Sequence, residues 1–373
     1  MHIVIDISSL PYGTGVSKYC AELVKALGQI DHTNQYTLFA GTLRQKHIFE
    51  SFVVENHLPK NFQFKWIPIS PRLQTILWND RQLVKLNWLI GDFDLYHSLD
   101  WSLAPTNKPT IITVHDLFFL KHPELQQHPY RKTLENRLHR AQQSQLPVIA
   151  VSQTTKQDLV ELIDYPADKI TVIYEALPIS SIHPSDWQTV QSKYQLPEKF
   201  LLMLGTLEPR KNVPRTIQAY LASDTNLPLV IVGKLGWEKL NLQPNENIHF
   251  TGFVSDADLQ AIWQHTHALL YPSLYEGFGF PILEAYQHQI PVLTSANSSM
   301  QEITHSKSIL VDPLDPTSIT KGINQLSHLS PTQRQQIIKA GTSQLKQFSW
   351  QTTAKQTLNL YNQQHNLSFL SNL

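Results

Sequence analysis

Short apolar runs rich in β-branched residues recur along the chain, and longer stretches with helical spacing separate them. In the first half the runs are residues 2–7, 36–40, 64–69, 95–98, 109–114, 148–152 and 170–174. In the second half they are residues 200–205, 227–233, 248–253, 268–272, 291–295 and 308–311. This alternation predicts parallel strands joined by crossover helices, which is an α/β fold.

About a dozen strands exceed what one strongly twisted open sheet usually holds, so we expect two doubly wound sheets. A polar, proline-bearing stretch at residues 177–199 contains no convincing strand and is the predicted linker. The predicted domains are therefore residues 1–178 and 179–350. Residues 351–373 are predicted to form a C-terminal helix and tail that can pack back on the N-terminal domain.

The composition argues against several classes of protein, including nucleic-acid-binding proteins and disulfide-rich or cysteine-based zinc-binding domains. Thirty Lys and Arg residues balance thirty Asp and Glu residues, so no net positive field draws the chain to nucleic acid. Cys20 is the single cysteine, which excludes an internal disulfide and a cysteine-based zinc site. No secretory signal and no apolar stretch of roughly 18 residues is visible. We expect a cytoplasmic protein that can contact a membrane only from its inner surface.

The segment YPSLYEGFGFPILEA, residues 271–285, carries the strongest chemical signal. It follows an apolar strand, and Pro281 marks the first turn of a helix after two glycines. Glycines let the backbone approach a ligand, and a helix N-terminus is a ready anion site, so a phosphate is the expected guest. Glu276 would then accept hydrogen bonds from sugar hydroxyls, and Glu284 from a ribose.

This segment resembles the signature of the GT-B glycosyltransferases of family four, the group 1 transferases. Their two glutamates stand on either side of seven residues, as Glu276 and Glu284 do. The loop GTLEPRKN, residues 205–212, looks like the family loop in which Arg210 and Lys211 neutralise the donor diphosphate. Two adjacent cations after a strand suit a leaving group that departs with two negative charges.

The N-terminal half continues the resemblance over about residues 1–350. YGTGVSK, residues 12–18, is similar to the family's glycine loop, and His115 with Asp116 resembles the pair whose histidine lies by the donor sugar. The resemblance implies four catalytic residues: His115, Glu276, Arg210 and Lys211. It implies these donor-binding residues: Gly13, Gly15, Asp116, Gly205, Gly277, Phe278, Gly279, Phe280 and Glu284.

The resemblance implies a GT-B fold, with two doubly wound Rossmann-like domains that face each other across a cleft. It also implies transfer with retained anomeric configuration, no metal and no cofactor besides the nucleotide diphosphate sugar itself. The Phe-Gly-Phe-Pro interior and HDLFFLKHPE, residues 115–124, resemble bacterial mannosyl- or rhamnosyltransferases. We therefore favour GDP-mannose as donor, with UDP-glucose and similar donors open. The expected acceptor is a glycan, free or linked to a lipid carrier.

The chain departs from the family pattern in two respects. Thr14 and the pair Val16-Ser17 stand where the family's glycine loop often reads Gly-Ile-Gly-Arg, which leaves the acceptor-facing side chains open. The residue that contacts the nucleotide base carries no motif. Lys234 and Leu235, which follow a predicted strand, are the positional candidates for flanking the base.

Other interpretations of these residues stay open. Glu276 and Glu284 could be solvated, Arg210-Lys211 could be an exposed turn, and His115-Asp116 could be a helix cap beside a buried histidine. Residues 72–88 could pack on the first sheet, which we favour, or lie on an anionic membrane.

Rival functions also remain. A dehydrogenase is disfavoured because Lys18 stands where a third glycine should pack. A catalytically silent subunit and a nucleotide-sugar epimerase on the same scaffold remain as alternatives to a transferase. Asp92-Phe93-Asp94 superficially matches a metal motif of another glycosyltransferase fold, but it precedes a strand instead of following one. A solvated turn is the better interpretation there.

Overall fold

The computed structural model describes residues 1–125, 131–178, 182–234, 236 and 245–370. The chain divides into two compact units. Unit 1 comprises Met1–Pro178 with Phe348–Leu373, and unit 2 comprises Ile179–Gln347. Each unit has its own parallel sheet, so each is a separate α/β fold.

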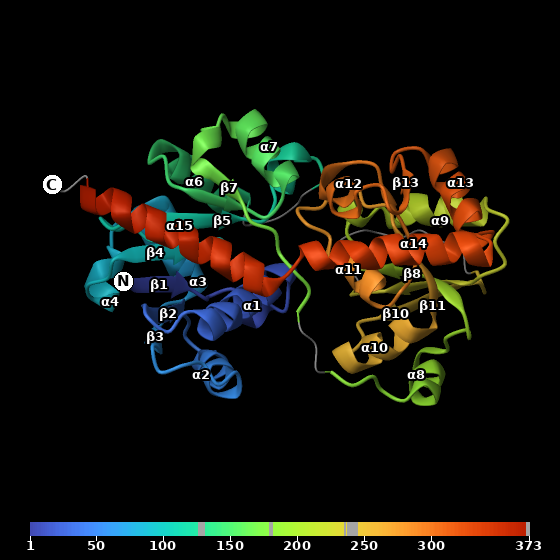
Figure 1. Ribbon diagram of the computed structural model, residues 1–373, viewed down its shortest axis with the longest axis horizontal. Helices are drawn as coiled ribbons and strands as arrows, with labels where there is room; N and C mark the ends of the chain where they lie inside the picture. Colours follow the sequence, from blue (N-terminus) through green and yellow to red (C-terminus); the bar gives the residue numbers. More distant parts are fainter. Residues whose placement is uncertain (126–130, 179–181, 235, 237–244, 371–373) are drawn as a thin grey trace. The chain divides into compact units, whose positions relative to one another are not determined.

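Unit 1 contains a seven-stranded sheet in the order β3-β2-β1-β4-β5-β6-β7 (Figure 1). The strands are β1 (His2–Asp6), β2 (Gln35–Gly41), β3 (Phe62–Ile67), β4 (Leu95–Ser98), β5 (Thr110–Val114), β6 (Val148–Ala150) and β7 (Ile170–Val172). The order reverses between β1 and β4. In doubly wound folds, this switch point is where ligands bind, outside the carboxyl ends of the strands.

The helices of unit 1 fill the crossovers and cover the sheet. They are α1 (Gly15–Ile30), α2 (Lys46–Glu55), α3 (Pro71–Gln74), α4 (Leu86–Ile90), α5 (Phe118–Lys121), α6 (Arg131–Gln143), α7 (Gln153–Ile163) and α15 (Trp350–Leu370). Shorter turns are the 3-10 helices η1 (Leu10–Tyr12) and η3 (Ala167–Lys169) and the π-helix η2 (Thr75–Asp80). Ser152 caps α7, because its hydroxyl accepts from the Thr155 amide at 3.0 Å.

Unit 2 contains a six-stranded sheet in the order β10-β9-β8-β11-β12-β13. The strands are β8 (Phe200–Leu204), β9 (Leu229–Val232), β10 (Ile248–Gly252), β11 (Thr266–Tyr271), β12 (Val292–Ser295) and β13 (Ile309–Val311). Its helices are α8 (Trp187–Tyr194), η4 (Pro209–Lys211), α9 (Val213–Leu221), α10 (Asp256–His265), α11 (Phe280–Gln287), α12 (Ser298–Thr304), α13 (Pro316–Ser327), α14 (Pro331–Gln344) and η5 (Leu345–Gln347). The switch point lies between β8 and β11.

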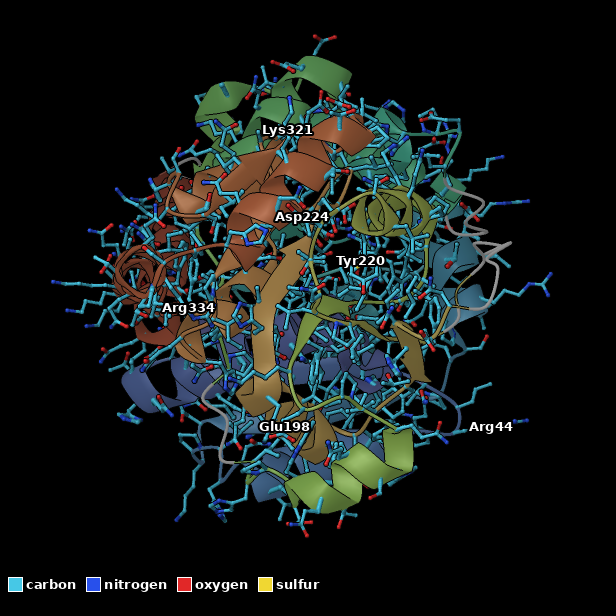
Figure 2. The ribbon with its side chains drawn as sticks, turned by 90° about the vertical axis from the view of Figure 1, so that its right-hand side faces the viewer. Arg44, Glu198, Tyr220, Asp224, Lys321 and Arg334 are labelled. Atoms are coloured by element: carbon cyan, nitrogen blue, oxygen red, sulfur yellow. The ribbon has the colours of Figure 1, made fainter. Side chains whose placement is uncertain are left out.

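Side-chain hydrogen bonds tie the helices of unit 2 to its strands. The Tyr220 hydroxyl at the end of α9 donates to the Leu227 carbonyl at 3.0 Å, just before β9 (Figure 2). Arg334 of α14 donates to the His267 carbonyl on β11 at 2.8 Å. The first bond anchors α9 just before β9, and the second anchors α14 to β11.

The prediction of two doubly wound α/β sheets is confirmed. Each predicted apolar run contains a strand, and the strands within each sheet pair in parallel. Buried strands read as continuous apolar runs because helices cover both faces of a parallel sheet. The stretch 177–199, where no strand was expected, carries helix α8, which Asp186 caps through the Thr189 amide at 2.9 Å.

The C-terminal helix α15 packs beside α1 in unit 1 (Figure 1). Its Thr353 hydroxyl donates to the Tyr174 carbonyl at 2.7 Å. Its buried Tyr361 hydroxyl lies 2.7 Å from His97 Nδ1 on β4, and His97 Nε2 lies 2.8 Å from the Thr113 hydroxyl on β5. This chain of bonds locks the last helix onto the middle of the unit 1 sheet.

Residues 72–88 pack on the first sheet, as we favoured. Trp78 and Leu86 belong to the hydrophobic core of unit 1. The same stretch nevertheless exposes four large apolar side chains: Leu73, Ile76, Leu83 and Trp88. Among the described residues, no helix is both long and apolar enough to cross a bilayer.

Candidate active site

The predicted site residues of unit 2 lie where strands β8 and β11 end. The two strands are neighbours in the sheet, so the loops that follow them meet at one edge. The amide of Leu274, in the loop after β11, donates to the Arg210 carbonyl at 2.7 Å in the loop after β8. Backbone contact between the two loops therefore fixes the positions of the two motifs relative to each other.

Glu276 lies between two cations. Its Oε1 accepts from Lys211 Nζ at 2.7 Å, and its Oε2 accepts from Arg210 Nη1. The Glu276 residue is 5% exposed, so this is a buried ion-paired cluster and the solvated interpretation of Glu276 is wrong. Arg210 and Lys211 likewise do not form a bare exposed turn, because both side chains are committed to the carboxylate.

Two residues that the sequence analysis missed complete the cluster. Arg210 Nε donates to the carboxylate of Glu208, and Lys211 Nζ donates to the Tyr271 hydroxyl at 2.8 Å. The Lys211 ammonium also lies 4.9 Å from the centre of the Tyr271 ring. Glu208 lies within the GTLEPRKN loop and Tyr271 ends β11, so their positions at strand ends were the signal that could have identified them.

The pKa values of the cluster follow from burial and charge. Burial alone would raise the pKa of Glu276, but the charges of Arg210 and Lys211 outweigh it and hold that pKa at about 2. Burial and the neighbouring Arg210 charge lower the pKa of Lys211, which Glu276 opposes. Glu276 is therefore ionised throughout the physiological range.

Glycines allow the loops of this edge to pack closely. A Cβ on Gly233, after β9, would lie 1.8 Å from the Gly205 carbonyl oxygen, and a Cβ on Gly205 would lie 3.0 Å from Lys211 Cε. Gly279 has φ of +113° at the N-cap of α11, a conformation that favours glycine. The predicted glycines Gly205 and Gly279 thus serve close approach and a tight turn.

Hydrogen bonds from the α12 residue Ser299 hold the loop before α11 in place. The Ser299 hydroxyl donates to the carbonyls of Glu276 at 2.8 Å and Phe278 at 2.7 Å. The rings of Phe278 and Phe280 pack edge to face at 5.4 Å, and Gly277 between Glu276 and Phe278 is buried. Pro281 stands in the first turn of α11 as expected, and Glu284 follows within that helix, half-buried.

His115 and Asp116 follow strand β5 in unit 1. The His115 ring is engaged on both sides, because Nδ1 lies 2.9 Å from Glu175 Oε1 and Nε2 lies 3.0 Å from the Leu99 carbonyl oxygen. Asp116 Oδ1 accepts from the Phe118 amide at 3.1 Å at the start of α5. Asp116 therefore forms a local turn ahead of α5, while the N-cap position of that helix belongs to Leu117, which makes no side-chain cap bond.

Gly13 and Gly15 lie between β1 and α1. Gly13 has φ of +66° and ends η1, and a Cβ there would meet nothing within 4 Å. Gly15 is the first residue of α1, which Thr14 caps in a reciprocal box with Ser17. The departures from the family's glycine loop, Thr14 and Ser17, therefore cap the helix.

Further buried charges at the carboxyl edge of the unit 1 sheet were missed by the sequence analysis. Asp6 ends β1, Asp100 follows β4, Glu175 follows β7, and Arg137 of α6 donates to the Ser98 and Thr113 carbonyls. Burial raises the pKa of Asp6 to about 6 and also raises that of Asp100. The sequence could have indicated this cluster, because three carboxyl groups stand at or just after predicted strand ends.

Of the two candidate residues for flanking the nucleotide base, the structure describes one. Lys234 Nζ lies 4.8 Å from the centre of the Phe253 ring, which follows β10 and is 67% exposed. Leu235 lies outside the described residues. An exposed ring beside a cation at the carboxyl edge offers a flat surface to an aromatic ligand.

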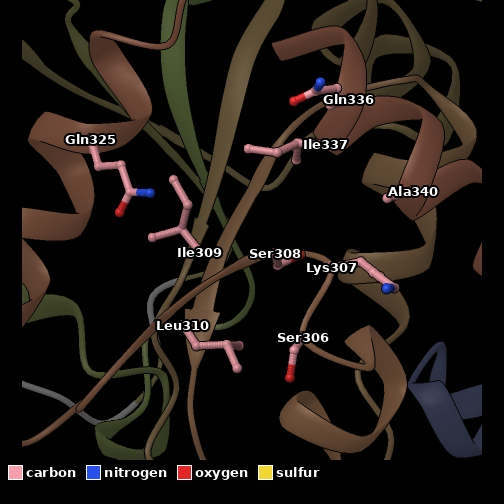
Figure 3. A pocket seen from close by; sticks show the side chains of 9 residues that line it. All are labelled: Ser306, Lys307, Ser308, Ile309, Leu310, Gln325, Gln336, Ile337 and Ala340. Carbon is pink, nitrogen blue, oxygen red and sulfur yellow. The ribbon is translucent and has the colours of Figure 1, made fainter. Parts of the chain in front are cut away.

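An open pocket of about 360 Å³ lies elsewhere in unit 2 (Figure 3). Ser306, Lys307, Ser308, Ile309, Leu310, Gln325, Gln336, Ile337 and Ala340 line it. These residues surround the start of β13, at the amino end of the strand. None of the four predicted catalytic residues lines this pocket, and neither do Gly277, Phe278, Gly279, Phe280 and Glu284.

Comparison with known proteins supplies the family. Residues 188–344 match the family described as glycosyl transferases group 1, and residues 13–180 match glycosyltransferase family 4. O-antigen chain mannosyltransferase B of Escherichia coli is 30% identical over 97% of this chain and 99% of its own length. Serotype-specific mannosyltransferase WbdA of Escherichia coli is 29% identical over 66% of this chain, which spans 32% of the WbdA chain.

A solved structure supports the fold. The Anabaena protein HepE, crystallised with UDP and glucose, has a TM-score of 0.69 and 16% identity, covering 97% of this chain and 100% of its own. Two parallel sheets and a relative that matches this chain nearly end to end agree with each other. This chain belongs to the group 1 glycosyltransferases, the GT-B enzymes of family 4.

Proposed function

We propose that this protein transfers a hexose, with retained anomeric configuration and without a metal ion, from a nucleotide diphosphate sugar to a glycan acceptor. The observation that carries the proposal is the convergence of Arg210 and Lys211 on Glu276 at the carboxyl edge of the unit 2 sheet. The named relatives that act on O-antigen chains support polysaccharide biosynthesis as the setting.

The two cations stabilise the leaving group. When the bond between the sugar and the diphosphate lengthens, negative charge develops on phosphate oxygens, and preorganised donors there lower the barrier. Arg210 and Lys211 are already held in place by Glu276, so little reorganisation is needed at that moment. They supply the positive charge that a metal ion supplies in other transferases.

Glu276 has two tasks in this proposal. Its carboxylate keeps two adjacent cations in a buried site, where they would otherwise repel each other. Because its pKa is held at about 2, it remains an acceptor for the hydroxyl groups of the donor sugar. The start of α11 at Gly279 to Phe280 presents backbone amides to the diphosphate, and Glu284 of that helix accepts from the ribose.

The donor is a GDP-sugar, with mannose favoured, and the base lies on the Phe253 ring beside Lys234. The support for mannose is that the similar full-length relative is named a mannosyltransferase. The support for the base position is the exposed ring next to the cation at the end of β10.

The acceptor is a growing glycan on a lipid carrier, so the protein works at the inner face of a membrane. The exposed Leu73, Ile76, Leu83 and Trp88 stand on a stretch that also carries the exposed cations Arg72, Arg81 and Lys85. Apolar side chains among cations are the composition that binds an anionic lipid surface.

A nucleotide-sugar panel tests the donor site. Purified protein with EDTA is incubated with GDP-, UDP-, dTDP- and ADP-sugars, and thermal stabilisation and donor hydrolysis are measured. We expect one nucleotide class to stabilise the protein and to be hydrolysed slowly. Glu276→Ala and Lys211→Ala should lose turnover, while Lys307→Ala, which alters a cation in the separate pocket at β13, should keep it.

The product and the alternatives are tested in the same material. The anomeric carbon–proton coupling of a product formed on a synthetic acceptor reports whether configuration is retained. Nucleotide binding without turnover would favour a catalytically silent subunit, and conversion of the donor into an epimer would favour an epimerase. Turnover that survives both Glu276→Ala and Lys211→Ala would overturn the donor-site assignment.

A further inference from the structure

The His115 ring in unit 1 faces an oxygen atom on each side. Nε2 lies 3.0 Å from the Leu99 carbonyl oxygen, and Nδ1 lies 2.9 Å from Glu175 Oε1. A carbonyl oxygen has no proton to give, so Nε2 must carry the proton in that bond. The remaining question is the proton between Nδ1 and Glu175.

Two protonation states satisfy this geometry. Either His115 is an imidazolium that donates to an ionised Glu175, or a neutral His115 accepts from a protonated Glu175. Both states hold one proton between the two groups, and in both the pair is neutral overall. Removal of that proton would leave a nitrogen lone pair against a carboxylate in a site where Glu175 is only 3% exposed.

The surroundings favour keeping the proton. Burial alone would lower the pKa of His115, but its bond to Glu175 and the charges of Glu175 and Asp100 raise it. Burial raises the pKa of Glu175, with Asp116 acting in the same direction. His97 of β4 also faces His115, as does the Tyr19 ring of α1, which meets the His115 ring edge to face at 4.8 Å.

We propose that Glu175 is a positioning residue that keeps a proton on Nδ1 of His115, so that Nε2 presents the N–H of a charged imidazolium instead of that of a neutral ring. In the absence of substrate this N–H donates to the Leu99 carbonyl. When a sugar hydroxyl enters, the donor exchanges the carbonyl for the hydroxyl oxygen while Nδ1 stays bound to Glu175. This inference rests on the proposed function and on the family resemblance by which His115 lies beside the donor sugar.

The arrangement follows a general logic of histidine sites. A partner on one ring nitrogen fixes the tautomer and the orientation of the other. Glu175 stands three residues after the end of β7, and His115 directly follows β5, so both side chains come from the carboxyl edge of one sheet. A glutamine at position 175 could keep a hydrogen bond to Nδ1, but it could not keep the charge that holds the proton.

The first test needs no enzymatic activity. The full-length protein is labelled with ¹³Cε1-histidine, and the His115 resonance is identified as the one lost in His115→Asn. In the unaltered protein, this resonance should titrate above the ordinary histidine range. In Glu175→Gln, the midpoint should fall by about one to three pH units, the range that one adjacent opposite charge produces.

The second test uses turnover with the donor found active in the panel. Activity should decline on the alkaline side as Nδ1 of His115 loses its proton, because the N–H at Nε2 of a neutral ring is a weaker donor than that of an imidazolium. Glu175→Gln should move that decline to lower pH by the same interval. Glu175→Asp keeps the carboxylate, so its alkaline decline should lie between those of the unaltered protein and of Glu175→Gln. Glu161→Gln, an exposed change on α7, should leave the profile unchanged.

Each outcome has a defined meaning. The proposal would be overturned if the titration midpoint of His115 were unchanged in folded Glu175→Gln. It would also be overturned if Glu175→Gln reduced activity by the same factor at every pH, because that is the result expected of a purely structural role. Circular dichroism shows whether the variant is folded, and Glu175→Asp supplies the second variant if it is not. If the protein turned over no nucleotide sugar, the proposed function would fail, yet the resonance titration would still decide whether Glu175 holds the proton.

Discussion

Lys211 Nζ lies 2.7 Å from Glu276 Oε1, although 65 positions separate the two residues in the chain. The contact exists because β8 and β11 are neighbours at the switch point of the unit 2 sheet. The ammonium is held by this carboxylate and by the Tyr271 hydroxyl, and its stem packs over Gly205. The site is thus a preorganised cation pair whose counter-charge is already in place.

Removal of the carboxylate should destabilise unit 2. Glu276→Gln leaves Arg210 and Lys211 without their common counter-charge in a buried site, and breaking such a pair typically costs about 3 to 5 kcal/mol. We expect a loss near the lower end, because the Arg210 side chain is 24% exposed and also binds Glu208. Urea unfolding of the two proteins measures the difference.

A double variant serves as the control for that result. Glu276→Gln with Lys211→Met removes both partners of the Lys211–Glu276 pair, so part of the lost stability should return. A double variant that is less stable than the sum of the two single changes would contradict this account of the cluster.

Asp6 should make stability depend on pH. Burial raises its pKa from 3.8 to about 6, so its contribution is fully present below pH 3.8 and is lost as the pH rises through about 6. Asp6→Asn removes that loss and should stabilise the protein at pH 7 to 8 by on the order of 2 to 3 kcal/mol, since one pKa unit corresponds to about 1.4 kcal/mol. Thermal unfolding between pH 4 and 8 checks this.

The sign of the Asp6 effect is what matters. Near pH 4 the two proteins should have similar melting temperatures, and the variant should gain an advantage as the pH rises. A variant that is less stable than the unaltered protein at pH 8 would show that ionised Asp6 is favourable in the folded state.

Gly233 should tolerate no side chain. A Cβ there would lie 1.8 Å from the Gly205 carbonyl oxygen, so Gly233→Ala must push apart the loops after β8 and β9. We expect a loss of more than about 3 kcal/mol, at the high end for a point substitution, and weaker binding of the donor nucleotide. Thermal unfolding and nucleotide titration measure the two effects.

Gly252→Ala is the matched control for that prediction. Gly252 has φ of +68°, but a Cβ there would meet nothing within 4 Å. Its cost is then limited to the strained backbone, on the order of 1 to 2 kcal/mol. Equal losses in the two variants would mean that the clash at Gly205 is relieved without consequence.

Tyr361→Phe should loosen the C-terminal helix. The substitution removes the hydroxyl that lies 2.7 Å from His97 Nδ1 and leaves that nitrogen buried without this partner, which costs about 1 to 3 kcal/mol. Hydrogen exchange should show faster exchange along α15. Asn359→Ala, an exposed change on the same helix, should leave exchange near its original rate, and equal effects would refute the role of the Tyr361 hydroxyl.

Sequence pattern located the strands of both sheets and the segments that the structure brings together at the ends of β8 and β11. The strand positions followed from apolar runs because both faces of a parallel sheet are buried. The motifs around Glu276 and around Arg210 were visible as short segments at strand ends, where ligand-binding residues of doubly wound sheets gather. Gly279 was predicted to let the backbone approach a ligand, and the structure adds that it holds a positive φ of +113° at the N-cap of α11.

Contacts between distant segments could not be predicted from the sequence. The pairing of Glu175 with His115 spans 60 positions and that of Tyr361 with His97 spans 264, and no local pattern links them. Strand order decides which carboxyl ends are neighbours, and burial decides which charges must be paired. The sequence by itself determined where strands end and which chemical groups stand there, because both are local properties. Only the tertiary structure decided which of these groups meet, because that depends on the order of strands in each sheet.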